Sequence, residues 1–382
     1  MHTLLLGLAL AASTPGASPP AGAPADRAVY EALCAQVAAT YDSARGGFVD
    51  KQGVPIEGAV ELAFRIAREG SAAAWQAQAR RTLDWTWTLF DSVGGGFFQS
   101  PADADPKQAS FNKRTDANAR RLETLIDAWR ASGEAADRRR CALIVDYFDR
   151  VLLDGRGGFV AGQFGDRELV PEINGLAIHA WLRWAAVSAE PSYREFAYRS
   201  LDRLWGTCWN ETFGLLRKGT FGEVIERPQL IDQCEAGRAY LLSARLTGRD
   251  LDLQHARVLG DLLLASFQDP ERGGFRTQAV PDKKGGIKSA AREDDENARA
   301  ARFLCELSNV TADPRYREAA RRAWRSFDKR LGRSTASAAD WALAIRASFV
   351  DEMPAPPAWK DTASPDAPSP RRRLPRGSAG RR

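Results

Sequence analysis

The sequence has few of the residues that bind metals and lacks the motifs of several common enzyme classes. Its five cysteines are scattered, with no CxxC pair and no neighbouring histidines at metal-ligand spacing. It contains no G-x-S-x-G elbow, no Walker loop and no G-x-G-x-x-G after a strand, so the α/β-hydrolase, P-loop and dinucleotide-binding classes have little support. We therefore expect free thiols, no metal site and no cofactor.

Long apolar runs are also missing. No stretch approaches the roughly 18 apolar residues of a membrane span, so we expect no transmembrane segment. Residues 1–25 contain a short apolar run, an A-x-A match at 9–11 and a Pro/Ala/Gly linker, which predict a signal peptide and a secreted or periplasmic protein. A disordered leader on a cytoplasmic protein is the alternative, because only His2 is basic before the apolar run.

Charge is nearly balanced outside the C-terminal tail. The net charge is +5, and residues 351–382 hold seven basic and four acidic residues, which accounts for three of these charges. We therefore expect no nucleic-acid partner. The tail is Pro-rich and basic, a composition that predicts disorder, whereas the 44% hydrophobic content of the whole chain is enough for a large core.

A glycine–aromatic turn recurs about every 50 to 60 residues, near positions 47, 96, 158, 214 and 274. The five copies read ARGGFVD, VGGGFFQ, GRGGFVA, TFGLLRK and ERGGFRT. We expect the glycines to allow φ > 0 where the chain leaves a helix, and the apolar ring to pack on the next helix. The expected packing rings are Phe48, Phe97, Phe159, Phe213 and Phe275.

Apolar residues recur at helical spacing on both sides of each turn, which predicts twelve helices. Six precede a turn or end the series, at 26–42, 72–91, 135–153, 191–207, 250–267 and 313–330. Six follow, at 57–69, 116–132, 172–188, 230–246, 294–308 and 337–350. The first set has a charged face and the second is rich in Ala, Gly and Leu. We predict an all-α fold in which residues 26–350 form an (α/α)6 toroid of outer and inner helices. Short β-hairpin-like loops would lie on one rim of the toroid. An open helical solenoid is the alternative.

The predicted inner helices begin with acidic residues that would meet at one end of the barrel. The candidates for catalysis are Asp116, Glu172, Asp232 and Asp294. The alternative is that each carboxylate only caps its helix. Nearby polar and aromatic side chains are candidates for substrate binding: Asn118, Asn174, Lys113, Phe98, Trp209 and Arg217. The aromatic rings would stack on a sugar and the cations would bind an anionic group, although loop cations are ordinarily solvated.

Five motifs occur in the order found in a known family. They are VGGGFFQS, FNKRTDANA, GGFVAG, EINGLA and the LIDQCEAG to DENARAARFL stretch, and together residues 41–330 resemble the helical domain of the thioredoxin-domain-containing family that includes spermatogenesis-associated protein 20. The family's thioredoxin-like domain has no counterpart here. Its HFEK motif is replaced by Ser110, Phe111, Asn112 and Lys113, and this puts the activity in doubt.

The wider resemblance is to six-hairpin glycosidases and acylglucosamine epimerases, which share the toroid. Epimerases of this fold use two histidines, but His255 lies on a predicted outer helix and His179 fits a hydrogen-bonded core position, so epimerisation is disfavoured. An inverting glycosidase needs two carboxyl groups roughly 6.5–9.5 Å apart. We expect a small-molecule or oligosaccharide ligand, bound either by a glycoside hydrolase with paired rim carboxylates or by a non-catalytic binding or scaffold protein. The sequence gives no oligomeric state.

Overall fold

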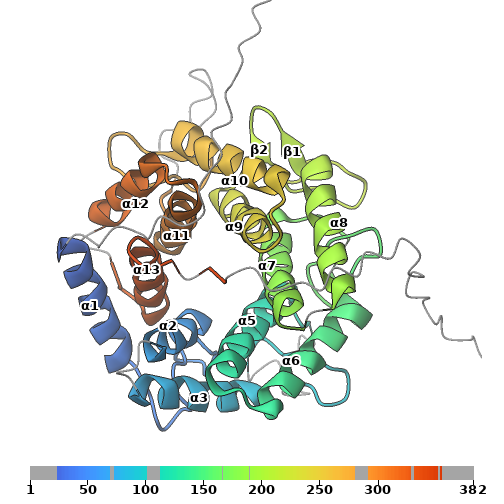
Figure 1. The fold of residues 1–382 in the computed structure, drawn as a ribbon, viewed down its shortest axis with the longest axis vertical. Helices are drawn as coiled ribbons and strands as arrows, with labels where there is room; N and C mark the ends of the chain where they lie inside the picture. The colour runs from blue at the N-terminus through green and yellow to red at the C-terminus, as the bar shows by residue number, and fades with distance from the viewer. Residues whose placement is uncertain are drawn as a thin grey trace, which may run out of the picture.

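Two concentric rings of helices form the body of the protein (Figure 1). The computed structural model describes residues 24–68, 73–100, 112–165, 167–188, 190–279, 291–327, 331–351 and 353–354. Within these residues there are twelve α-helices. The inner ring consists of α2 (Glu57–Ala67), α5 (Thr115–Ser132), α7 (Pro171–Ser188), α9 (Leu230–Thr247), α11 (Asp294–Thr311) and α13 (Thr335–Ala347). The outer ring consists of α1 (Pro24–Ala39), α3 (Ala73–Trp87), α6 (Ala135–Tyr147), α8 (Pro191–Cys208), α10 (Asp250–Leu262) and α12 (Pro314–Ser326).

The inner ring is closed. Each inner helix packs against the next one along the chain, and α13 packs against α2. Each inner helix also packs against the outer helix that follows it, while α1 covers α13 (Figure 1). This closure confirms the predicted (α/α)6 toroid and excludes the open solenoid, whose first and last repeats would not touch.

The predicted helices agree with the observed ones to within a few residues. Two outer helices reach their predicted ends through π-helical turns, η1 (Phe148–Leu152) after α6 and η2 (Leu263–Phe267) after α10. The outer helices α1 and α3 end three and four residues earlier than expected, because their last predicted residues already belong to the following loop. Helix α12 ends at Ser326, and residues 328–330 of its predicted range lie outside the described residues. The predicted leader and most of the predicted tail lie outside the described residues. None of the described helices is long and apolar enough to span a membrane.

The toroid has two different ends. At the loop end, where the inner helices begin, long loops that contain the glycine–aromatic turns arrive from the outer helices. One of them contains the small hairpin of β1 (Trp209–Asn210) and β2 (Gly214–Leu215). At the turn end, where the inner helices end, connections such as residues 133–134 between α5 and α6 are short. A side chain near the beginning of an inner helix therefore belongs to the loop end.

The turn at Asp91–Phe97 shows why two glycines precede the aromatic ring. Gly95 and Gly96 have φ angles of 79° and 74°, in the left-handed region that glycine adopts freely. A Cβ atom on Gly96 would lie 2.5 Å from a ring carbon of Tyr147. Asp91 holds the start of the turn by accepting hydrogen bonds from two backbone N–H groups, and Phe97 is fully buried. The turn therefore packs its ring into the core, as expected.

An amide side chain from the first turn of an inner helix fastens each of four such turns. The amide oxygen accepts a hydrogen bond from the backbone N–H of the buried apolar residue in the turn. The amide NH2 group donates to the backbone C=O of the same apolar residue. It also donates to the backbone C=O of the residue four positions before the Asn or Gln itself. The pairs are Asn118 with Phe97, Asn174 with Phe159, Gln233 with Leu215, and Asn297 with Phe275. In the fourth repeat our expectation was wrong: Phe213 is 44% exposed and Leu215 fills the buried position, since the turn glycine is Gly214.

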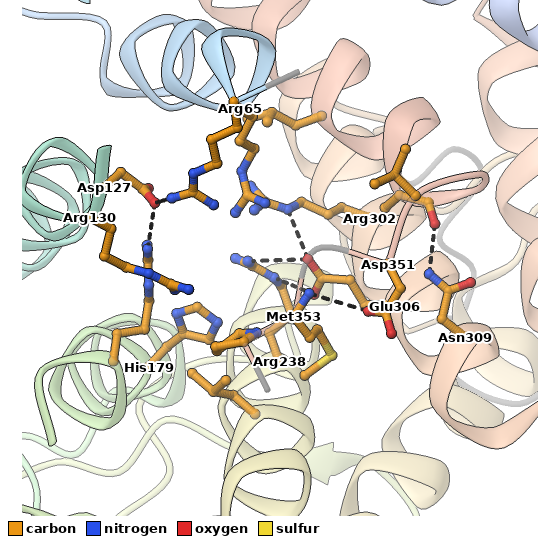
Figure 2. Close-up of a pocket in the computed structure, with 17 residues that line it drawn as sticks. Arg65, Asp127, Arg130, His179, Arg238, Arg302, Glu306, Asn309, Asp351 and Met353 are labelled. Carbon is orange, nitrogen blue, oxygen red and sulfur yellow. Dashed lines mark hydrogen bonds and ion pairs between the residues drawn. The ribbon is translucent and has the colours of Figure 1, made fainter. Parts of the chain in front are cut away.

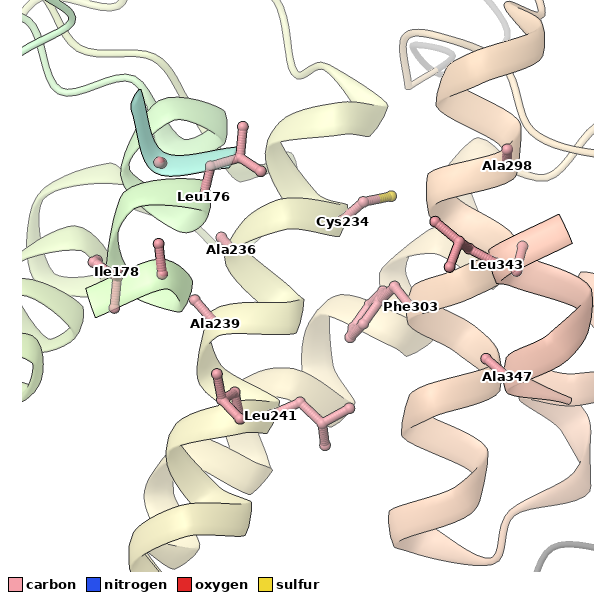
Figure 3. Close-up of a cluster of buried hydrophobic side chains, with 14 of the residues drawn as sticks. Leu176, Ile178, Cys234, Ala236, Ala239, Leu241, Ala298, Phe303, Leu343 and Ala347 are labelled. Atoms are coloured by element: carbon pink, nitrogen blue, oxygen red, sulfur yellow. The ribbon is translucent and has the colours of Figure 1, made fainter. Parts of the chain in front are cut away.

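The core lies between the two rings and between neighbouring inner helices. Figure 3 shows small and branched side chains interlocking across α7, α9, α11 and α13, with Phe303 between α9 and α13. Gly175 of α7 lies directly against the backbone of α9, where an added Cβ would be 2.4 Å from the carbonyl carbon of Glu235. All five cysteines are free, and four of them are buried. The close approach of α7 and α9 brings the first turns of both helices together at the loop end.

Candidate active site at the loop end

Ion pairs line the inside of the inner ring from one end to the other. Towards the turn end, Arg302 contacts Glu61 at 2.5 Å and Glu306 at 3.0 Å, and Arg183 contacts Asp127 at 2.8 Å. The inner helices thus turn apolar faces towards the outer ring and towards one another, and charged side chains towards the axis. A ligand on this axis would meet carboxylates and guanidinium groups.

Arg299 lies at the centre of the charged cluster at the loop end. Its Nη1 is 3.7 Å from Glu172 Oε1 and 3.6 Å from Glu235 Oε1, and its Nε is 4.0 Å from Asp340 Oδ2. These distances are too long for direct hydrogen bonds, and the buried Nε has no hydrogen-bond partner among the described residues. The guanidinium is therefore attracted by three carboxylates but retains N–H groups that can donate to a ligand oxygen.

Arg217 joins two of the predicted catalytic carboxylates. Its Nε donates to Asp232 at 2.8 Å and its Nη2 donates to Glu172 at 3.2 Å, while the backbone N–H of Glu172 also donates to Asp232. Asp232 is completely buried, and this burial raises its pKa although Arg217 opposes the shift. Glu172 retains 26% of its side-chain surface. Only Glu172 of this pair can therefore touch a ligand, and Asp232 fixes its position.

Glu296 is a second accessible carboxyl group with unusual surroundings. Burial, together with the negative charges of Asp295 and Glu172, raises the pKa of Glu296 to about 7. Its Oε2 atom is buried and has no hydrogen-bond partner among the residues described. Burial also raises the pKa of Glu172, where Glu235 adds to the shift and Arg299 reduces it. The charge of Glu172 therefore contributes to the raised pKa of Glu296, whereas the pKa of Glu172 itself responds to burial, Arg299 and Glu235.

The other two predicted catalytic residues are held by neighbouring protein groups. Arg114 contacts Asp116 through both Nε and Nη2; burial raises the pKa of Asp116, but Arg114 and Arg120 outweigh it and the pKa is lowered. Asp294 accepts hydrogen bonds from Ser337 and from the indole N–H of Trp341. The structure thus brings Glu172 and Asp232 together and gives Asp116 and Asp294 separate partners.

The predicted substrate-binding residues divide in the same way. Asn118 and Asn174 are buried and use their amide groups on the glycine–aromatic turns, as described above. Lys113 is also buried: it contacts Asp91 at 2.5 Å and the Gly95 carbonyl at 2.7 Å, and it lies over the ring of the half-buried Phe98. Trp209 stacks on Trp205 of the outer helix α8. Among these six residues, Arg217 alone joins the cluster around Glu172.

Four residues of the cluster were absent from the predicted site: Glu235, Glu296, Arg299 and Asp340. Three of them had a weak signal in the sequence. Glu235 is one helical turn after Asp232, and Glu296 is the last of four consecutive acidic residues, of which we selected the second, Asp294, from the sequence. Charged residues that recur along an Ala-rich inner helix, such as Arg299 and Arg302, are the pattern that would have found them.

His255 is on the outer helix α10, as expected, and stacks on Trp205. His179 is hydrogen-bonded to Glu123, as expected, but it is half-buried and lines a cavity inside the inner ring instead of lying in the core. Among the described residues, no group of three His, Cys, Asp or Glu side chains could hold a metal ion.

The raised pKa of Glu296 predicts a pH-dependent stability difference for Glu296→Gln. An unfolded glutamate titrates near 4.3, so the charged form of Glu296 is disfavoured in the folded protein and the wild type loses stability as the pH rises from about 4.5 through 7. Glutamine is neutral throughout. We expect roughly 1–2 kcal/mol more stability for the variant than for the wild type at pH 8.5, allowing for partial exposure, and little difference at pH 4.5. Urea unfolding at both pH values measures this, and equal differences at both would contradict the assignment.

The fold is shared with enzymes that act on carbohydrates. A D-mannose isomerase structure matches with a TM-score of 0.69 and 12% identity, over 86% of this chain and 99% of that one. The cellobiose 2-epimerase of Spirochaeta thermophila matches with a TM-score of 0.68 and 16% identity, over 85% and 97% of the two chains. A family 76 α-mannanase of Bacteroides thetaiotaomicron matches with a TM-score of 0.65 and 11% identity, over 84% and 95%.

Comparison of the sequence with family models and with curated proteins identifies no relative of this chain. No family model matches the chain, and no curated protein matches it. The resemblance to the family of spermatogenesis-associated protein 20 remains a prediction from sequence motifs. At these low identities the structural matches establish the fold alone: the chain has the six-hairpin (α/α)6 toroid of carbohydrate-active epimerases and glycoside hydrolases.

Proposed function

We propose that the protein is carbohydrate-active and binds its ligand at the loop end, against Glu172, Glu296 and Arg299. The observation that carries the proposal is the arrangement around Arg299, a guanidinium with a buried, unpartnered Nε and carboxylates 3.6–4.0 Å away. Hydroxyl groups of a sugar can accept from the arginine and donate to the carboxylates at the same time. Proteins of the same fold are named above for mannose, cellobiose and mannan, which supports a sugar as the ligand of this chain.

The favoured chemistry is glycoside hydrolysis by the Glu172 and Glu296 pair. Glu296, with its pKa near 7, is suited to donate a proton to the leaving oxygen. Glu172, held by Arg217, is suited to act as the carboxylate that activates water or stabilises positive charge on the sugar. Asp232 and Arg217 are then positioning residues, because Asp232 is buried and acts through Glu172.

A non-catalytic sugar-binding protein is the second candidate. Three of the four carboxylates that the sequence singled out accept at least two hydrogen bonds each from protein donors, namely Asp116, Asp232 and Asp294, whereas Glu172 accepts from Arg217. The turn rings Phe97, Phe159 and Phe275 are buried and offer no stacking surface. These features weaken the catalytic reading and leave the binding surface around Arg299 intact.

Activity on a panel of oligosaccharides tests the proposal. We expect hydrolysis by the wild type, and a loss of about 100-fold or more in kcat/KM for Glu172→Gln and for Glu296→Gln, since each removes a group that transfers protons or stabilises charge. Glu211→Gln, at an exposed position in the β1–β2 turn, is the control and should be unchanged. Binding without product in every case would favour the second candidate, and a panel in which no sugar binds would reject both.

A further inference from the structure

A second charged site lies at the opposite end of the barrel. A cavity there opens between the C-terminal halves of the inner helices, and Figure 2 shows Arg65, Asp127 and Arg130 on one side of it and Arg302 with Glu306 on the other. It leaves about 30 Å³ for the centres of water molecules, which is room for a few waters or one small ion and too little for a sugar ring. None of the residues proposed above for the sugar site lines it.

The positive charges in this cavity exceed the negative charges that face them on the α5 and α7 side. Arg68, Arg130 and Arg183 surround the carboxylate of Asp127, which already receives hydrogen bonds from Arg68 and Arg183. Glu123, one helical turn earlier on α5, also acts on Arg183, although its side chain is bonded to His179. On the opposite side, Arg302 and Arg238 are balanced by Glu61 and Glu306. Three guanidinium groups therefore face two carboxylates, and the excess of positive charge is local.

Arg130 is an exposed residue at the edge of this corner. Among the described residues, no acceptor lies within hydrogen-bond or ion-pair distance of its guanidinium, although it extends into the cavity near His179 (Figure 2). Burial and the like charges of Arg68 and Arg183 lower the pKa of Arg130. His179 is engaged with Glu123 and offers no negative charge of its own.

Residues after α13 also line the cavity, namely Val350, Asp351, Met353 and Pro354. Among these described residues, Asp351 is the one that carries a negative charge. The Asp351 carboxylate is 3.1 Å from the guanidinium of Arg245, a residue that does not line the cavity. It also accepts a hydrogen bond from the backbone N–H of Met353. Within the described residues, the negative charge that acts on Arg130 is therefore that of Asp127, which Arg130 shares with Arg68 and Arg183.

We propose that the corner formed by Arg68, Arg130 and Arg183 binds a small tetrahedral oxyanion of the phosphate or sulfate class. Such an ion has enough oxygens to accept from three guanidinium forks at once, whereas a carboxylate has two oxygens and Asp127 already provides one carboxylate. The size of the cavity fits a free ion or the phosphate end of a larger molecule. This site is separate from the sugar site and does not depend on the function proposed for it.

Thermal unfolding in different sodium salts at equal ionic strength tests this. Phosphate or sulfate should raise the melting temperature above its value in chloride, with saturation at a concentration that gives the dissociation constant. The dissociation constant is measured separately for inorganic phosphate, for sulfate and for a phosphate monoester. Comparison of the three dissociation constants shows whether the site prefers a free ion or a phosphate group carried on an organic molecule. Equal melting temperatures in all of these salts would overturn the proposal.

Arg130→Gln separates binding from a structural role. Because Arg130 has no partner and stands near like charges, the variant should melt no lower than the wild type in chloride, yet bind phosphate at least about tenfold more weakly. Arg139→Gln removes a charge from an exposed position on α6, away from the cavity, and should keep the wild-type affinity. An unchanged phosphate affinity in Arg130→Gln would also refute the site, whatever the result of the sugar assays.

Discussion

Gly175→Ala should destabilise the protein by about 3 kcal/mol or more, although alanine is the better helix former. The added Cβ would lie 2.4 Å from the carbonyl carbon of Glu235, 2.5 Å from the nitrogen of Ala236 and 2.6 Å from the Glu235 oxygen. All three are backbone atoms of α9, so no side chain can rotate away. The helices must separate, and the core that they share must lose contacts.

Gly206→Ala is the matched control. Gly206 also lies in a helix, the outer helix α8, and a Cβ there would meet no atom within 4 Å. We expect this variant to gain about 0.5–1 kcal/mol, because alanine loses less conformational entropy than glycine on folding. Urea unfolding of both variants measures the contrast. If Gly175→Ala were as stable as the wild type, the close packing of α7 on α9 would be wrong.

The same substitution should disturb the candidate site. Gly175 is three residues after Glu172, whose backbone N–H donates to Asp232 of α9 at 3.0 Å. Moving α7 away from α9 stretches this bond and shifts Glu172 relative to Arg299. Any sugar affinity should therefore fall in the fraction of Gly175→Ala that remains folded.

Asn174→Ala should cost roughly 2–4 kcal/mol, because it removes three hydrogen bonds inside the protein. The Asn174 amide accepts from Phe159 N–H at 2.8 Å and donates to the carbonyls of Phe159 and Val170. Without it, the Phe159 N–H is buried with no acceptor in this arrangement, and the turn loses its attachment to α7. The loss should appear in urea unfolding.

Asn210→Ala provides the comparison for Asn174. The Asn210 side chain accepts from the N–H groups of Thr212 and Phe213 in an exposed turn, where water can replace it. We expect a cost below about 1 kcal/mol there. If Asn174→Ala kept its stability and lost sugar binding instead, Asn174 would be a ligand-binding residue, as the sequence had suggested.

The sequence predicted the helices and their arrangement because the relevant signals are local. A helical apolar period on both sides of a recurring GGF turn defines a helical hairpin, and six such hairpins can close into a ring. The prediction did not use the Asp or Asn before each turn, as at Asp91 and Asn210, whose side chain accepts from the next backbone N–H groups in the structure. The aromatic ring alone was a weaker guide, since Leu215 replaces it in the fourth repeat.

The candidate site was harder to predict because it depends on which groups meet across the barrel. Helical position placed Glu172 and Asp232 at the same end, but it did not show that Arg217 and burial would make one accessible and the other internal. It also gave no means of separating Asn174, a turn-fastening residue, from a ligand-binding amide. The central role of Arg299 follows only from three carboxylates contributed by three different helices.

Calorimetric titration of mono- and oligosaccharides into the wild type, Glu172→Gln and Arg130→Gln tests the central claim most directly. The account predicts that at least one sugar binds the wild type and Arg130→Gln equally and binds Glu172→Gln much more weakly, because the sugar site is at the loop end. Failure of every sugar to bind, or equal binding to the wild type and Glu172→Gln, would contradict it.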